Sequence, residues 1–289
     1  MPTAHVNGID IEYVTNGDPA NPPLLLVMGL GGQLIAWPEK FVEELTARGF
    51  FTIRYDNRDV GLSTKFDGMP DISALLVGDG TSAPYRVEDM ADDAAALLTE
   101  LGIDRAHVVG VSMGGMITQA LAINHAQRFL TACSIMSTTG DRTVGTPTAE
   151  AMSALLRPVA TSREEAIAAS LEVGKVIGSP GFPSNTEEMT RRAAAAYDRC
   201  YCPEGTARQL GAIMASPDRT EVLRTVLMPF LVIHGEADPL VRLNGGQATA
   251  AAVPGSVLIV IPGMGHDLPE GAWSQIIGAI VANTELAAV

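Results

Sequence analysis

Three residues have side chains suited to nucleophilic catalysis: Ser112, Asp238 and His266. A serine hydroxyl is a weak nucleophile at neutral pH and needs a base, which histidine supplies because it exchanges its proton near neutrality. A carboxylate at the other ring nitrogen orients the imidazole and stabilises its protonated form. The three residue types therefore predict acyl transfer, with Ser112 as nucleophile, His266 as base and Asp238 as the orienting acid.

The sequence around Ser112 is typical of a nucleophile on a tight turn. Gly110 and Gly114 flank the serine in a G-x-S-x-G pattern, and glycine at both places removes side chains that would collide at such a turn. Residues 106–111 are β-rich, and residues 113–123 have helical spacing without proline. A strand, a turn and a helix are therefore expected in succession, which supports a chemical role for a pattern that also occurs by chance.

Other histidines and acids fit the same roles less well. His234 ends a predicted strand, where a structural hydrogen bond suits it better than catalysis. Glu236 lacks the turn-forming proline that follows Asp238, and Asp267 is too close in sequence to serve His266. The remaining histidines do not follow a predicted strand of the sheet: His5, His107 and His125.

Backbone donors are also required, because acyl transfer develops an oxyanion that preorganised N–H groups stabilise. The N–H of Met113, the residue after the nucleophile, is one expected donor. The other is expected from the glycine-rich segment at residues 29–32, through the N–H of Leu30. This segment lacks the later glycine and the acidic residue of a dinucleotide fingerprint, so no cofactor is expected.

Alternating strands and helices are expected to position these residues. Because a strand, a helix and a strand in succession form a parallel crossover, the chain is predicted to be an α/β protein with a mostly parallel, doubly wound sheet. In such a sheet, chemistry gathers at the carboxyl ends of the strands. The predicted strands span residues 5–14 (an edge pair), 24–28, 50–55, 106–111, 129–136, 229–233 and 256–261, and the predicted helices flanking them span residues 37–48, 87–101, 113–123 and 273–284.

The stretch from residue 140 to residue 223 differs in composition from its flanks. It is alanine-rich, and helical pieces are predicted at residues 148–156, 162–177, 186–201 and 204–215. We therefore expect residues 1–139 and 224–289 to form the core and residues 140–223 to be an inserted helical cap. An insertion at the carboxyl edge of the sheet is also where a lid lies.

Two charged segments could be mistaken for ion-binding sites. The loop at residues 56–63 is predicted to be an internally paired turn rather than a metal or phosphate site. The acids that open the helix at 87–101 are explained by the positive helix N-terminus. Residues 75–84 are predicted to be a loop.

Composition narrows the partners and the location. The formal net charge of -14 argues against nucleic acid and anionic membranes as partners. The odd number of cysteines, three, and the lack of a secretory segment before Leu24 favour a reducing cytoplasm. Cys200 and Cys202 lack further ligands at zinc spacing, so no metal site is expected.

Five motif segments lie at residues 27–31, 54–63, 110–115, 232–239 and 262–266. On these segments the chain resembles the α/β-hydrolase superfamily over essentially its whole length. Within the superfamily it looks most like the aclacinomycin methylesterase group, because of Met28, the Arg-Tyr-Asp-x-Arg-Asp block at 54–59 and Gly-Met-Gly-His at 263–266. The resemblance implies an α/β-hydrolase fold with the triad of Ser112, Asp238 and His266, a helical cap and no cofactor. It also marks a structural family turn that contains Asp56, Arg58, Gly61 and Ser63.

The predicted activity is hydrolysis of a carboxylic ester through an acyl-serine intermediate, in the manner of a carboxylesterase or methylesterase. The substrate is expected to be a small, moderately hydrophobic ester. The same residues would also serve a lactonase, a thioesterase, a carbon–carbon bond hydrolase or a perhydrolase. A ligand-binding receptor with negligible turnover is a further alternative.

Overall fold

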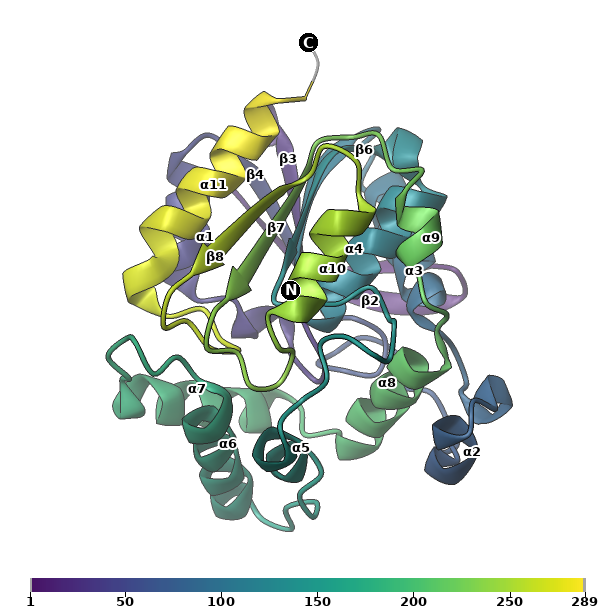
Figure 1. Ribbon diagram of the computed structural model, residues 1–289, viewed down its shortest axis with the longest axis vertical. Helices are drawn as coiled ribbons and strands as arrows, with labels where there is room; N and C mark the ends of the chain where they lie inside the picture. The colour runs from purple at the N-terminus through teal and green to yellow at the C-terminus, as the bar shows by residue number, and fades with distance from the viewer. Residues whose placement is uncertain (1, 288–289) are drawn as a thin grey trace.

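An eight-stranded sheet with helices on both faces forms the centre of the molecule (Figure 1). The computed structural model describes residues 2–287. The strand order is β1-β2-β4-β3-β5-β6-β7-β8. The β1–β2 and β2–β4 pairs are antiparallel and the other pairs are parallel, so the predicted mostly parallel, doubly wound α/β sheet is confirmed.

The elements follow the predicted order closely. The strands are β1 (Thr3–Val6), β2 (Ile9–Asn16), β3 (Pro23–Val27), β4 (Phe51–Tyr55), β5 (Ala106–Val111), β6 (Phe129–Ile135), β7 (Phe230–Gly235) and β8 (Val257–Ile261). The α-helices are α1 (Glu39–Ala47), α2 (Ile72–Leu76), α3 (Val87–Glu100), α4 (Met113–Asn124), α5 (Ala149–Leu155), α6 (Arg163–Ile177), α7 (Thr186–Arg199), α8 (Pro203–Ala215), α9 (Thr220–Leu223), α10 (Asn244–Ala252) and α11 (Trp273–Glu285).

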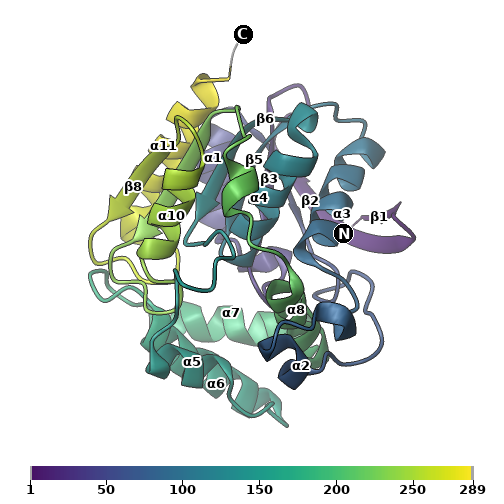
Figure 2. The same ribbon diagram turned by 45° about the vertical axis from the view of Figure 1, so that its right-hand side comes forward.

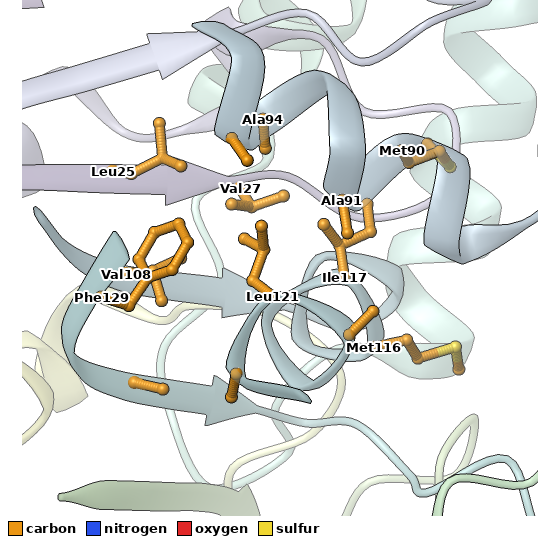
Figure 3. Close-up of a cluster of buried hydrophobic side chains, with 14 of the residues drawn as sticks. Leu25, Val27, Met90, Ala91, Ala94, Val108, Met116, Ile117, Leu121 and Phe129 are labelled. Carbon is orange, nitrogen blue, oxygen red and sulfur yellow. The ribbon is translucent and has the colours of Figure 1, made fainter. Parts of the chain in front are cut away.

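Strand β3 shows why its sequence is a continuous apolar run. Leu25 and Val27 belong to the core cluster under α3 and α4, which Figure 3 shows, whereas Leu24 and Leu26 belong to the cluster under α1 and α11. All four side chains are fully buried. A parallel strand covered on both faces needs apolar residues at every position rather than at alternate ones.

Three α-helices within residues 2–287 were not predicted. Helix α10 begins Asn-Gly-Gly, which is a poor helix-forming sequence, yet Gly245 and Gly246 are buried where the helix packs beside β7. A β-carbon at Gly246 would lie 2.3 Å from Nδ1 of His234, so tertiary packing overrides the local propensity. Helix α2 shares only residues 75 and 76 with the segment 75–84 that was predicted as a loop, and the carboxylate of Asp71, the residue before the helix, caps it. The third, α9, is a short helix of four residues.

Helices α5 to α8 lie together at one end of the sheet, the end toward which the arrow of β7 points (Figures 1 and 2). They occupy the chain between β6 and β7. Helices α6 and α7 pack against each other and contain no fully buried residue. Helix α8, in contrast, buries residues against the rest of the protein. None of the helices within residues 2–287 is long and apolar enough to cross a membrane.

Acid sensitivity is expected from His107 of β5. The side chain is buried, and its Nδ1 lies 2.9 Å from Oγ1 of Thr131. Burial, and secondarily the charge of Arg105, lowers the pKa of His107 from 6.5 to about 4. Between these two pKa values His107 is protonated in the unfolded chain and neutral in the folded chain. The free energy of unfolding therefore falls as the pH falls from 6.5 toward about 4. The expected loss is about 3 kcal/mol between those pH values.

Urea unfolding at a series of pH values measures this loss. His107→Gln should flatten the dependence of the unfolding free energy on pH in this window. His5→Gln, a change at an exposed histidine, is the control and should leave the slope as it is in the wild type. An unchanged slope in His107→Gln would refute the assignment.

Candidate active site

Ser112 lies on a strained turn between β5 and α4. Its φ and ψ are 55° and -118°, a region that residues other than glycine rarely occupy. The neighbouring glycines permit the turn, because a β-carbon at Gly114 would lie 2.1 Å from the carbonyl oxygen of Val27, and one at Gly110 would lie 2.0 Å from that of Gly114. The predicted steric need for both glycines is confirmed.

The structure brings Ser112, His266 and Asp238 together. His266 follows β8 and Asp238 follows β7, so the parallel pairing of these strands places both at the same edge of the sheet as Ser112. Nε2 of His266 lies 2.9 Å from Oγ of Ser112, and Nδ1 lies 2.7 Å from Oδ2 of Asp238. Because an ionised carboxylate only accepts hydrogen bonds, Nδ1–H donates to Asp238 and Nε2 accepts from the serine hydroxyl.

Asp238 is fixed by the turn that it begins. Its other oxygen, Oδ1, accepts hydrogen bonds from the N–H groups of Leu240 and Val241, both at 2.9 Å. The carboxylate side chain is completely buried. Both oxygens therefore have donors, and the one that faces His266 cannot turn away without breaking the turn.

His234 supports this turn rather than the serine, as its sequence position indicates. Its Nε2–H donates to the carbonyl oxygen of Val241 at 2.7 Å, whereas Nε2 is 3.7 Å from Oδ2 of Asp238. The side chain is fully buried, and burial lowers the pKa of His234. A neutral imidazole with its proton on Nε2 therefore holds the residue whose N–H binds Asp238.

The last residue of α6 and the segment after it hold the loop that carries His266. The N–H of His266 donates to the carbonyl oxygen of Ile177 at 2.7 Å, and the N–H of Gly265 donates to Oγ of Ser179 at 2.8 Å. The hydroxyl of Ser179 also donates to the carboxylate of Asp267. Asp267 thus bonds to the segment after α6, and sequence analysis did not find this support.

The glycine-rich segment after β3 passes beside the serine. A β-carbon at Gly29 would lie 3.1 Å from Cβ of Ser112 and 3.7 Å from its Oγ. Within residues 2–287, none of the hydrogen bonds in turns, loops and caps uses the N–H of Leu30 or of Met113. This placement fits the predicted donor roles, which stay predictions.

The charged loop at residues 56–63 is only partly an internally paired turn. Oδ2 of Asp56 does accept the N–H of Leu62 at 2.8 Å. However, its charged groups pair mainly with distant helices: Asp56 with Arg199 of α7 at 2.7 Å, Arg58 with Asp93 of α3 at 2.7 Å, and Asp59 with Arg208 of α8 at 2.8 Å. Purely internal pairing is therefore wrong, because the partners lie far away in the sequence.

Asp93 also corrects the explanation given for the acids of α3. Its side chain is only 2% exposed and bonds to Arg58 through both carboxylate oxygens. The helix N-terminus alone does not account for the burial and pairing of Asp93.

Among the described residues, no group of three or more His, Cys, Asp or Glu side chains could hold a metal ion.

Comparisons with known proteins identify the family and the fold. The family model for the alpha/beta hydrolase fold matches residues 22–271. Rhodomycin D methylesterase DauP of Streptomyces sp. (strain C5) is 30% identical, and the match covers 100% of both chains. 3-oxoadipate enol-lactonase 2 of Acinetobacter baylyi is 27% identical over 90% of this chain and 87% of the lactonase. The enol-lactonase structure from Burkholderia xenovorans LB400 has a TM-score of 0.78 at 24% identity, covering 98% of this chain and 100% of that one.

The chain therefore belongs to the α/β-hydrolase family. Its likeness to the methylesterase group within that family, inferred from Met28 and the motifs at 54–59 and 263–266, is confirmed by the full-length match to a methylesterase.

Proposed function

We propose that this protein is a carboxylic-ester hydrolase in which Ser112, His266 and Asp238 act as nucleophile, base and orienting acid. The observation that carries the proposal is the continuous hydrogen-bonded series from Asp238 through His266 to Ser112, at 2.7 and 2.9 Å. Nucleophile, base and orienting group within hydrogen-bond reach of one another are the signature of an activated serine.

In the proposed reaction, Oγ of Ser112 attacks the ester carbonyl carbon while its proton passes to Nε2 of His266. The negative charge on the carbonyl oxygen is stabilised by the N–H groups of Leu30 and Met113. The carbon–oxygen bond to the alcohol then breaks, and the alcohol leaves with the proton from His266. Water then attacks the acyl-serine carbonyl and gives a proton to Nε2 of His266, and His266 passes that proton to Oγ of Ser112 as the bond to the acyl group breaks and the acid departs. Asp238 stays ionised throughout.

We propose that residues 140–223 form a cap over this site and that the substrate is a small, moderately hydrophobic ester, with a methyl ester favoured. The full-length likeness to an enzyme named rhodomycin D methylesterase supports the methyl ester. The net charge of -14 disfavours nucleic acid and anionic membranes as partners. The three cysteines are unpaired, in keeping with a cytoplasmic location.

A turnover panel tests the reaction class. It should contain p-nitrophenyl esters of graded chain length, methyl esters of bulky acids, thioesters, lactones and a carbon–carbon cleavage substrate. We expect turnover of the oxygen esters, and a kcat/KM higher by at least tenfold for another class would reject the ester assignment.

A fluorophosphonate probe distinguishes an enzyme from a receptor that only binds ligands. The probe should label Ser112, and a slowly turned-over ester should protect the serine from labelling. Absence of both labelling and turnover in folded protein would contradict the proposed activity.

A further inference from the structure

Gln209 of helix α8 connects the helices between β6 and β7 to the backbone beside Ser112. Its side chain is completely buried. Oε1 accepts the N–H of Gly31 at 2.8 Å, and Nε2 donates to the carbonyl oxygen of Arg58 at 2.8 Å. Since one partner only donates and the other only accepts, the orientation of the amide is fixed.

The backbone at Gly31 is shaped by this contact. Its φ is +66°, and a β-carbon there would lie 2.9 Å from Oγ1 of Thr206, one turn before Gln209 in α8. The next N–H, that of Gly32, is bound to the carbonyl oxygen of Gly29 at 3.0 Å. The N–H groups of the two residues after Leu30 therefore both have acceptors. That of Gly31 binds Gln209 of α8, and that of Gly32 binds the carbonyl oxygen of Gly29.

We propose that Gln209 is a positioning residue that orients the N–H of Leu30 toward the oxyanion, so that α8 completes the donor pair from outside the sheet. This rests on the proposed esterase function. If the N–H of Gly31 lost its acceptor, the peptide units of this glycine-rich segment could rotate, because glycine has few steric restraints. A donor that is out of place stabilises the transition state less while substrate binding is little changed.

Gln209→Met tests the proposal, because it keeps the length and volume of the side chain and removes both hydrogen bonds. We expect kcat to fall about tenfold or more with KM within twofold of the wild type, since complete loss of one oxyanion donor costs about a hundredfold to a thousandfold. The inhibition constant of an aryl trifluoromethyl ketone, whose serine adduct carries an oxyanion, should rise by about the same factor as kcat/KM falls.

Ser216→Ala is the matched control. Oγ of Ser216 at the end of α8 accepts the N–H of Val87 at 2.9 Å, so the variant loosens the same helix without touching the segment at 29–32. Its kcat is expected to stay within twofold of the wild type. Should Gln209→Met fail to fold, Gln209→Asn keeps the amide but cannot span both partners, and the same fall in kcat is expected.

If Gln209→Met has a lower melting temperature but unchanged kcat and unchanged inhibitor affinity, Gln209 has only a structural role and the proposal is overturned. In that case wild-type turnover and labelling of Ser112 would still support the esterase assignment. An equal fall in kcat in Ser216→Ala would also overturn it, because general loosening of α8 would then explain the loss. If the wild type neither turns over esters nor labels at Ser112, both proposals fail.

Discussion

Replacing Ser112 with alanine is expected to lower kcat for ester hydrolysis by about a millionfold, to the level left by binding and the backbone donors alone. Replacing His266 with alanine should cost about as much, because Oγ of Ser112 then lacks the Nε2 acceptor 2.9 Å away. The two residues act as one unit, so the double variant should be no slower than either single variant. Initial rates on the best p-nitrophenyl ester in the panel measure all three.

Circular dichroism and urea unfolding serve as the controls for these variants. Ser112 is partly buried and the His266 side chain is 7% exposed, so these measurements check that each truncated variant keeps the wild-type fold. Asp238→Asn should lower kcat less, by about ten-thousandfold, because the amide keeps the shape but no longer stabilises the imidazolium. Losses that multiply in the double variant would argue against a shared proton-transfer step, and substantial activity in pure Ser112→Ala protein would reject the mechanism.

The residues of this relay could be found from the sequence because each one is a local signal. Ser112, Asp238 and His266 all have reactive side chains in the loop that follows a short apolar strand, and parallel strands place such loops at one edge of a sheet. The fold was predictable for the same reason. Strands covered on both faces appear as continuous apolar runs such as that of β3.

The contacts of α8 with the core could not be found in this way. In a sequence, Arg208 and Gln209 look like polar residues on the exposed face of an amphipathic helix, yet both are buried. Their partners Asp59 and Gly31 lie 149 and 178 residues away, beyond the reach of any periodicity. The partners of the charged groups in the loop at 56–63 are equally distant in the sequence, on α3, α7 and α8. The sequence does not identify these partners, so the loop was predicted to pair internally.

The free energy of unfolding is expected to fall by about 3 to 5 kcal/mol in Arg208→Met, because the variant leaves Asp59 as a buried charge without its countercharge. The two side chains are 5% and 0% exposed, and they are joined by two hydrogen bonds, from Nη2 to Oδ1 at 2.8 Å and from Nε to Oδ2 at 3.0 Å. Within the part of the chain that the structure describes, only the neutral hydroxyl of Tyr85 and the N–H of Phe66 would still bond to the Asp59 carboxylate. Urea unfolding at pH 7 measures the loss.

The double variant Asp59→Asn/Arg208→Met separates the cost of the unpaired charge from the cost of lost packing. Asparagine tolerates the φ of 72° at position 59 and carries no charge, so the double variant should be more stable than Arg208→Met alone. Arg163→Met, which breaks the exposed pair of Arg163 and Asp198 between α6 and α7, should have little effect. A double variant as unstable as the sum of its single variants would mean that the charges of Asp59 and Arg208 do not depend on each other, and that α8 is held to the core by packing alone.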